Sequence, residues 1–128
     1  MIRKLISHVK DHPNVIGYQI DNETKPYDTS GENVQTLFVK YMREKYKDLE
    51  YINKEFGLDY WSNKINTWED SPDVRGTINQ SLKCEFEKFQ RKLVTDFLSW
   101  QASIVNEYKR DDQFITHNFD YSWKGHSF

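Results

Sequence analysis

A long helical repeat in the second half of this 128-residue chain constrains its fold more than any other feature. Between Leu82 and Tyr108, large apolar side chains recur at steps of three or four residues, which is the period of one helical face. The repeat consists of Leu82, Phe86, Phe89, Leu93, Phe97, Trp100, Ile104 and Tyr108. The spacing predicts a helix over about 79–108, roughly 40 Å long at 1.5 Å per residue.

Two short apolar segments on either side of the helical region are predicted to be strands. Residues 14–21 follow a helix over 2–9 that Pro13 ends, because a proline keeps the residue before it out of the helical region. Their apolar residues do not alternate strictly, which is typical of a strand buried on both faces in a parallel sheet. Residues 114–119 are predicted to be the second strand. The order describes a βαβ unit with an insertion.

Two further helices are predicted inside the excursion between the strands. One begins near Thr29, which has capping-box spacing with Glu32. Asp48 is predicted to cap a short helix, and Gly57 stands where a left-handed residue would close it. Residues 58–78 are predicted to be irregular.

The predicted fold class is α/β: a partial (β/α)8 TIM-barrel fragment, with two short parallel strands and a large helical excursion between them. Two strands alone make a poor sheet, and parallel strands need cover on both faces. The chain is about half of the ~250 residues typical of such a barrel. Open strand edges favour chain association, so we expect a homo-oligomer.

Charge and composition exclude several classes of partner. Lys and Arg number 18 against 20 Asp and Glu, so the sequence has no electrostatic footprint for nucleic acid or an anionic membrane. Aromatic residues make up 16% of the chain, which argues against disorder and suits a polar ligand with apolar faces, such as a sugar.

Cysteine content and hydropathy indicate the expected compartment. The single Cys84 excludes an intrachain disulfide and a cysteine-based zinc site. No apolar run approaches the roughly 20 residues of a membrane span, and residues 1–13 do not form a secretory signal. We expect a reduced, cytoplasmic setting, although a signal on a longer parent chain would lie outside this sequence.

Glu23 is the best candidate for a reactive group. It comes directly after the predicted strand 14–21 and begins the connecting loop, where α/β barrels keep their reactive groups. A carboxyl partly withdrawn from water can donate a proton near neutrality. The alternative is a solvated loop carboxylate or a partner for a helix dipole.

Three blocks of sequence together resemble a known family. The first runs from His12 to Glu23, with the sequence HPNVIGYQIDNE. The second holds Phe56-Gly57, Tyr60-Trp61-Ser62 and Trp68, and the third is Thr116-His117-Asn118-Phe119. In order and spacing they resemble the β-galactosidases of glycoside hydrolase family 42, with the first block at the fourth barrel strand and the third at the fifth. The resemblance covers essentially the whole chain.

The resemblance implies a role for three residues in the hydrolysis of β-galactosides. Glu23 matches the general acid/base of a retaining mechanism. Asn22 matches the asparagine that hydrogen-bonds the sugar 2-hydroxyl. Trp61 matches a tryptophan lining the galactose subsite, where an indole face suits the apolar side of the sugar ring. The alternative for Trp61 is a core anchor under an irregular loop.

Two departures from the family pattern limit what the chain is expected to do. Some members hold zinc through cysteines in the loop after the acid/base, but residues 24–35 contain none, so we predict no metal and no cofactor. The four histidines, His8, His12, His117 and His126, show no ligand spacing. The family's nucleophilic glutamate ends the seventh strand, whereas this chain ends after the fifth. We therefore expect residues 1–128 alone to be inactive.

Two alternatives to this function remain open at the level of sequence. A non-catalytic carbohydrate-binding or assembly module would not need the pair Asn22-Glu23. A mannanase- or cellulase-like hydrolase of the same barrel clan would keep that pair but not the block Tyr60-Trp61-Ser62.

Overall fold

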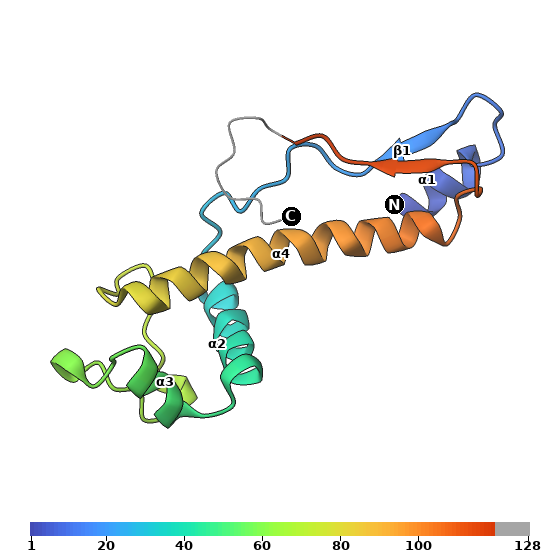
Figure 1. Cartoon of the computed structure of the whole chain (residues 1–128). Coiled ribbons are helices and arrows are strands. Elements are labelled where there is room, and N and C mark those ends of the chain that lie inside the picture. Colours follow the sequence, from blue (N-terminus) through green and yellow to red (C-terminus); the bar gives the residue numbers. More distant parts are fainter. Residues whose placement is uncertain (120–128) are drawn as a thin grey trace. The chain divides into compact units, whose positions relative to one another are not determined.

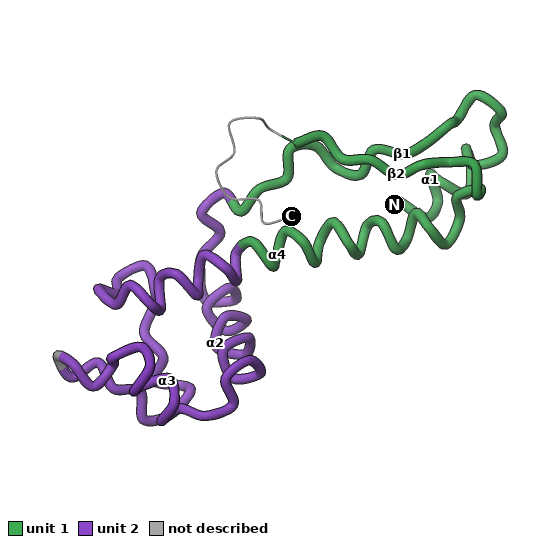
Figure 2. Tube along the Cα trace, in the orientation of Figure 1, with its two compact units in different colours: residues 1–26, 91–128 green, residues 27–90 purple. Residues whose placement is uncertain are grey.

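The computed structural model of the chain describes residues 1–119, apart from the side chain of Trp61. They form two compact units: unit 1, with Met1–Pro26 and the residues from Arg91 onward, and unit 2, with Tyr27–Gln90 (Figure 2). The elements in chain order are α1 (Ile2–Val9), β1 (Gly17–Gln19), α2 (Glu32–Tyr46), α3 (Leu49–Glu55), the 3₁₀ helices η1 (Tyr60–Ser62) and η2 (Trp68–Asp70), α4 (Gln80–Asn106) and β2 (Phe114–Thr116) (Figure 1).

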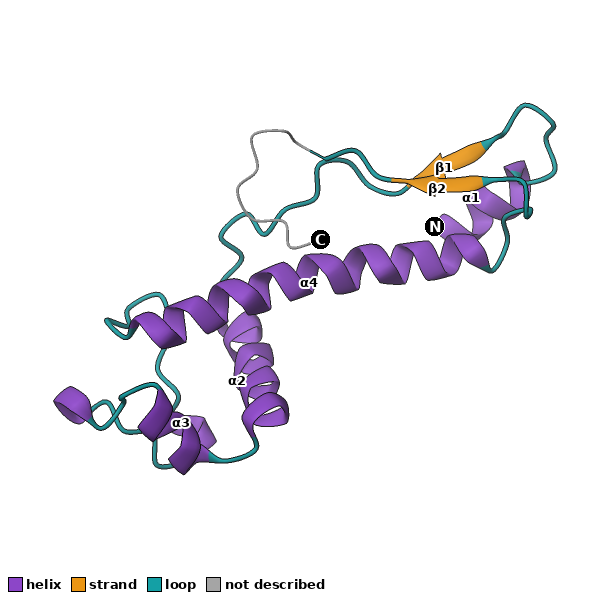
Figure 3. Cartoon of the chain, in the orientation of Figure 1, coloured by secondary structure: helices purple, strands orange, loops and turns teal. Residues whose placement is uncertain are grey.

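The two strands of unit 1 pair in parallel, as the sequence predicts (Figure 3). Gly17 lies opposite Phe114, and Gln19 lies opposite Thr116. Both strands are three residues long, shorter than the predicted ranges 14–21 and 114–119. Extended pairing stops after Ile20, because the next residue, Asp21, takes a positive φ of 51°.

The prediction of a strand buried on both faces is wrong for the described part of the chain. Within residues 1–119 the sheet consists of β1 and β2 alone. Ile16 is 66% exposed and Phe114 is 53% exposed, whereas Tyr18 and Ile115 are half-buried. The strand faces therefore lack the cover that a parallel sheet needs.

The buried side chain of Gln113 holds together the two segments that lead into β1 and β2. The Gln113 amide donates to the carbonyl oxygens of Lys10 and Val15 at 3.1 and 2.8 Å, and its own oxygen accepts from the N–H of Arg110 at 2.9 Å. The Arg110 guanidinium also donates to the carbonyl of Val15 at 3.1 Å. These bonds join the turn before β2 to the segment before β1 and set the strands side by side.

The helix starts in unit 2 agree only partly with the sequence prediction. The capping box at Thr29 is wrong: Gly31 is the N-cap of α2, at a φ of 121° that L side chains rarely adopt. Asp48 caps α3 as predicted, accepting from the N–H of Glu50 at 2.9 Å. Gly57 has a φ of 64°, which confirms the left-handed residue after that helix.

The irregular segment of unit 2 is held by a buried side chain. The Asn53 amide donates to the carbonyl oxygen of Ile65 at 2.8 Å, and its oxygen accepts from the N–H of the same residue at 2.9 Å. The segment also contains η1 and η2. The apolar side chains buried in unit 2 are Phe38, Met42, Ile52, Leu58, Ile65, Val74, Leu82 and Phe89.

The long predicted helix is confirmed as α4, with 27 residues. Asn79 caps it, because its side-chain oxygen accepts from the N–H of Leu82 at 2.9 Å. Along its predicted stripe, Phe89 and Ile104 are buried, whereas Trp100 is 56% exposed. In residues 1–119, no helix combines the length and the apolar character needed to cross a bilayer.

Candidate active site

Asn22 and Glu23 lie in a tight turn just after β1. Asp21 and Glu23 both have a φ of 51°, so two left-handed residues flank Asn22. The carboxylate of Asp21 accepts from the N–H of Asn22 at 2.9 Å and from the hydroxyl of Thr24 at 2.5 Å. The Thr24 hydroxyl, and after it the Asn22 N–H, hold the pKa of Asp21 below its ordinary value. The ionised carboxylate of Asp21 therefore stabilises the turn through these two hydrogen bonds.

The end of β2 reaches the same turn from the other side. The carbonyl oxygen of Asn118 accepts from the N–H of Glu23 at 2.9 Å. The Asn118 side-chain amide donates to Asn22 Oδ1 at 3.0 Å and to Glu23 Oε1 at 3.4 Å. Because parallel strands end at one edge of a sheet, residues about 95 positions apart meet here. The sequence analysis did not predict this contact of Asn118; the only signal for it was the position of Asn118 in the second predicted strand.

His117 bonds the backbone immediately before the turn. Its Nδ1 lies 2.6 Å from the carbonyl oxygen of Ile20. A carbonyl oxygen only accepts, so in the neutral ring Nδ1 carries the hydrogen and Nε2 is bare. Nε2 is buried and has no hydrogen-bond partner among residues 1–119. The Phe119 ring stands edge-on to the imidazole, with centroids 4.7 Å apart.

The polar groups of the turn remain accessible from outside. Asn22 is exposed and Glu23 is half-buried. The Asn22 oxygen already accepts from Gln19 at 3.3 Å and from Asn118 at 3.0 Å, so the amide of Asn22 is the group placed to donate to a ligand. The half-buried Glu23 follows Asn22 directly in the chain.

Trp61, the third predicted site residue, belongs to the other unit. It lies in η1 of unit 2, between the exposed residues Tyr60 and Ser62, and its side chain is outside what the structure describes. Asn22 and Glu23 lie in unit 1. The structure brings those two together, and the role of Trp61 stays a prediction.

Metal ligation has no visible basis in the described residues. Within residues 1–119, no group of three or more His, Cys, Asp or Glu side chains could hold a metal ion. Cys84 is an exposed free thiol on α4. His126 lies outside the described residues.

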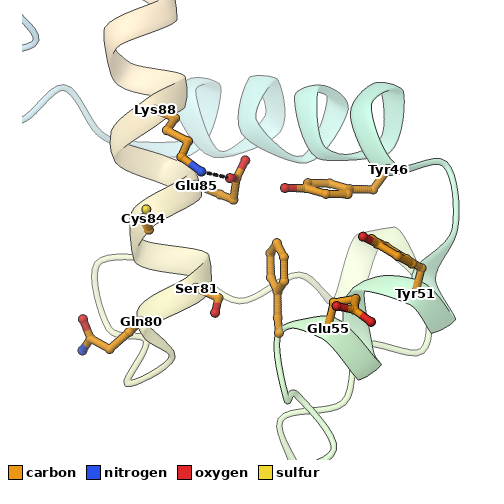
Figure 4. Close-up of a pocket in the computed structure, with 9 residues that line it drawn as sticks. Tyr46, Tyr51, Glu55, Gln80, Ser81, Cys84, Glu85 and Lys88 are labelled. Atoms are coloured by element: carbon orange, nitrogen blue, oxygen red, sulfur yellow. Dashed lines mark hydrogen bonds and ion pairs between the residues drawn. The ribbon is translucent and has the colours of Figure 1, made fainter. Parts of the chain in front are cut away.

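A hollow that the sequence did not reveal lies wholly within unit 2 (Figure 4). Its volume is about 470 Å³. One wall is aromatic, with the rings of Tyr46 and Tyr51 stacked at 6.1 Å and the Phe56 ring edge-on to Tyr46 at 5.4 Å. The start of α4 supplies the opposite, polar wall. The hollow joins residues from three helices, which no local sequence pattern indicates.

The carboxylate of Glu85 in that hollow is fully paired. It is 5% exposed and lies 2.6 Å from the ammonium groups of both Lys45 and Lys88. Burial acts to raise the pKa of Glu85, but hydrogen bonds from the two lysines outweigh it and hold the pKa below its ordinary value. Glu85 therefore joins α2 to α4 as an ion and is a poor candidate for proton transfer.

Comparisons with known proteins indicate which family this chain resembles. A family model described as beta-galactosidase matches residues 1–127. β-Galactosidase YesZ of Bacillus licheniformis is 28% identical over 123 residues, which cover 92% of this chain and 18% of that protein. β-Galactosidase YesZ of Bacillus subtilis is 30% identical over 83% of this chain and 16% of that protein.

Solved structures of β-galactosidases also match the fold of this chain. The crystal structure of β-galactosidase from the psychrophilic Marinomonas ef1 matches with a TM-score of 0.83 and 26% identity, over 93% of this chain and 19% of that one. The β-galactosidase structure from Bacillus circulans sp. alkalophilus also has a TM-score of 0.83, at 22% identity. The chain spans less than a fifth of the length of these relatives.

Proposed function

This chain belongs to the β-galactosidases of glycoside hydrolase family 42, and we propose that it forms the central part of the catalytic TIM barrel of a retaining enzyme. The substrates are terminal β-D-galactosides. Membership of the family argues against a mannanase- or cellulase-like hydrolase of the same clan.

Glu23 is the general acid/base in this proposal. The single observation that carries it is the pair Asn22-Glu23 at the carboxyl end of β1, held against Asn118 at the end of β2. Reactive groups of α/β barrels lie at this edge of the sheet. Glu23 is half-buried, so its carboxyl can be shielded from bulk water and still reach a substrate.

The reaction needs a second carboxylate, which the family places at the end of its seventh strand. In the first step this nucleophile attacks the anomeric carbon, and Glu23 gives its proton to the departing glycosidic oxygen. In the second step the ionised Glu23 takes a proton from water, which displaces the nucleophile and releases galactose. We propose that the nucleophile lies in a segment outside residues 1–128.

Asn22 and Trp61 hold the sugar. The amide of Asn22 donates to the 2-hydroxyl, a contact that strengthens in the transition state. The indole of Trp61 packs against the apolar face of galactose. Asn22 lies next to Glu23 in the turn, which supports its role, whereas Trp61 rests on the matched sequence block.

The test uses Glu23→Gln in the full-length enzyme, with two galactosides that differ in leaving group. We expect kcat/KM for methyl β-galactoside to fall about 10²- to 10⁴-fold, because this poor leaving group needs a proton. For dinitrophenyl β-galactoside, whose leaving group needs little help, the fall should be much smaller. Glu44→Gln, at an exposed carboxylate of α2, is the matched control. Equal losses on both substrates would remove Glu23 from the acid role.

A further inference from the structure

A series of hydrogen bonds continues past the ends of β1 and β2. Beyond the strands it includes a side chain as well as backbone groups. The N–H of Ile20 donates to the carbonyl oxygen of Thr116 at 2.9 Å, as in a parallel sheet. The imidazole of His117 then bonds the carbonyl of Ile20 at 2.6 Å. Further on, the N–H of Glu23 donates to the carbonyl of Asn118 at 2.9 Å. A side chain of the β2 segment thus sits between two backbone bonds.

This series of hydrogen bonds holds a backbone that is unfavourable on its own. Asp21 and Glu23 lie in the left-handed region, which non-glycine residues rarely adopt. Such conformations persist where the surrounding bonds determine them. The bonds from His117 and Asn118 lie on either side of this stretch. They therefore fix the backbone position from which the Glu23 side chain projects.

The Asn118 side chain acts on the carboxyl itself. Its amide nitrogen has two hydrogens and lies within hydrogen-bonding distance of Asn22 Oδ1 and Glu23 Oε1, at 3.0 and 3.4 Å. An oxygen that accepts from an amide is favoured as the unprotonated oxygen of a carboxyl group. The contact at Oε1 therefore limits rotation of the Glu23 carboxyl and makes its two oxygens inequivalent.

We propose that Asn118 and His117 are positioning residues for the acid/base of this enzyme: Asn118 orients the Glu23 carboxyl by binding Oε1, and the Nδ1–H of His117 anchors the strand end from which that carboxyl projects. This proposal rests on the proposed role of Glu23. It assigns a task to the two residues that directly follow β2.

Asn118→Ala in the full-length enzyme tests the first half of the proposal. We expect kcat/KM for methyl β-galactoside to fall about 10²-fold, the scale of a misplaced catalytic group, and kcat/KM for dinitrophenyl β-galactoside to change little. Loss of overall structure would lower both values equally. Asn33→Ala, at an exposed asparagine of α2, is the control. An equal loss on both substrates, or no loss, would overturn the role of Asn118.

A pair of His117 variants tests the second half. The amide nitrogen of an asparagine can occupy the place of Nδ1, whereas that of a glutamine extends toward the place of Nε2, where the structure offers no partner among residues 1–119. We expect His117→Asn to keep most of the activity on methyl β-galactoside, and His117→Gln to show the same substrate-dependent loss as Asn118→Ala. Equal activity of the two variants would overturn the anchoring role.

A double variant separates this proposal from the one on which it rests. If Asn118 acts through Glu23, the effects of the two substitutions are not additive. Adding Asn118→Ala to Glu23→Gln should then lower kcat/KM for methyl β-galactoside by less than about threefold, relative to Glu23→Gln alone. A full further 10²-fold loss would show that Asn118 acts independently of Glu23. If Glu23→Gln alone discriminates between leaving groups and the Asn118 and His117 variants do not, only the positioning proposal fails.

Discussion

The N–H of Glu23 and the carbonyl oxygen of Asn118 form a 2.9 Å hydrogen bond that joins the ends of two parallel strands. The proposed acid/base is therefore fixed through its own backbone, and the Asn118 amide lies against its side chain as well. A group held at both points loses little freedom when a substrate binds, which is the condition for efficient proton transfer.

Asn22→Ala should affect substrates that carry a 2-hydroxyl far more than those that lack it. We expect kcat/KM for a β-galactoside to fall about 10²- to 10³-fold, because the lost contact is strongest in the transition state. For the matching 2-deoxygalactoside the same variant should lose less than tenfold. Similar losses on both sugars would contradict the contact between Asn22 and the 2-hydroxyl.

Trp61→Ala should weaken productive binding of galactose in the full-length enzyme while the fold stays intact. We expect KM to rise about tenfold with a smaller change in kcat, and Trp61→Phe to retain most of the affinity through its aromatic face. Trp68→Ala serves as the comparison at a half-buried tryptophan of η2. An unchanged kcat/KM for Trp61→Ala would return Trp61 to the role of core anchor.

Glu85→Gln should lower stability at neutral pH and alter its pH dependence. Because the pKa of Glu85 lies below its ordinary value in the folded chain, its ion pairs stabilise the fold above about pH 5, and this contribution is lost as pH falls through the folded pKa. We expect a loss of about 1–3 kcal/mol at pH 7 that shrinks toward pH 3. Urea unfolding at fixed protein concentration measures it, with the exposed Glu87→Gln as control. A loss independent of pH would contradict the ionised pair.

Residues 1–128, produced alone, should associate and should hydrolyse no galactoside. Ile16 and Phe114 are exposed beside the two-stranded sheet, and uncovered apolar edges favour contact between chains. Light scattering at micromolar concentration should report a dimer or larger species, and Phe114→Lys should shift it toward the monomer. A monomer that unfolds cooperatively would contradict the prediction of a homo-oligomer.

Local patterns in the sequence were enough to predict much of the fold. The period of the apolar stripe located α4, and the chemistry of Asp48 and Gly57 located the ends of α3, because each depends on neighbours within a few residues. The cap predicted at Thr29 was wrong because α2 begins later: Gly31, at a φ of 121°, is the N-cap, and no side chain caps the helix. The strands were predicted too long because the turn at Asp21 is set by bonds to Thr24 and to the distant β2 segment.

The location of the candidate site could also be predicted from local sequence. The contacts that hold its residues in place could not. Asn22 and Glu23 are adjacent in sequence and follow a strand, so their location can be inferred from the chain alone. The contacts of His117 and Asn118 require the register of β1 against β2, which a single sequence does not specify. The pairing of Glu85 with Lys45 likewise spans 40 positions.

The stereochemistry of azide capture by Glu23→Ala tests the central claim most directly. With the acid/base removed, dinitrophenyl β-galactoside can still form the galactosyl-enzyme, and azide, which needs no general base, then displaces the enzyme carboxylate. The account predicts faster turnover in azide and β-galactosyl azide as the product, identified by nuclear magnetic resonance of the anomeric proton. Formation of α-galactosyl azide would make Glu23 the nucleophile, and no acceleration by azide would leave it outside the reaction; either result would contradict the account.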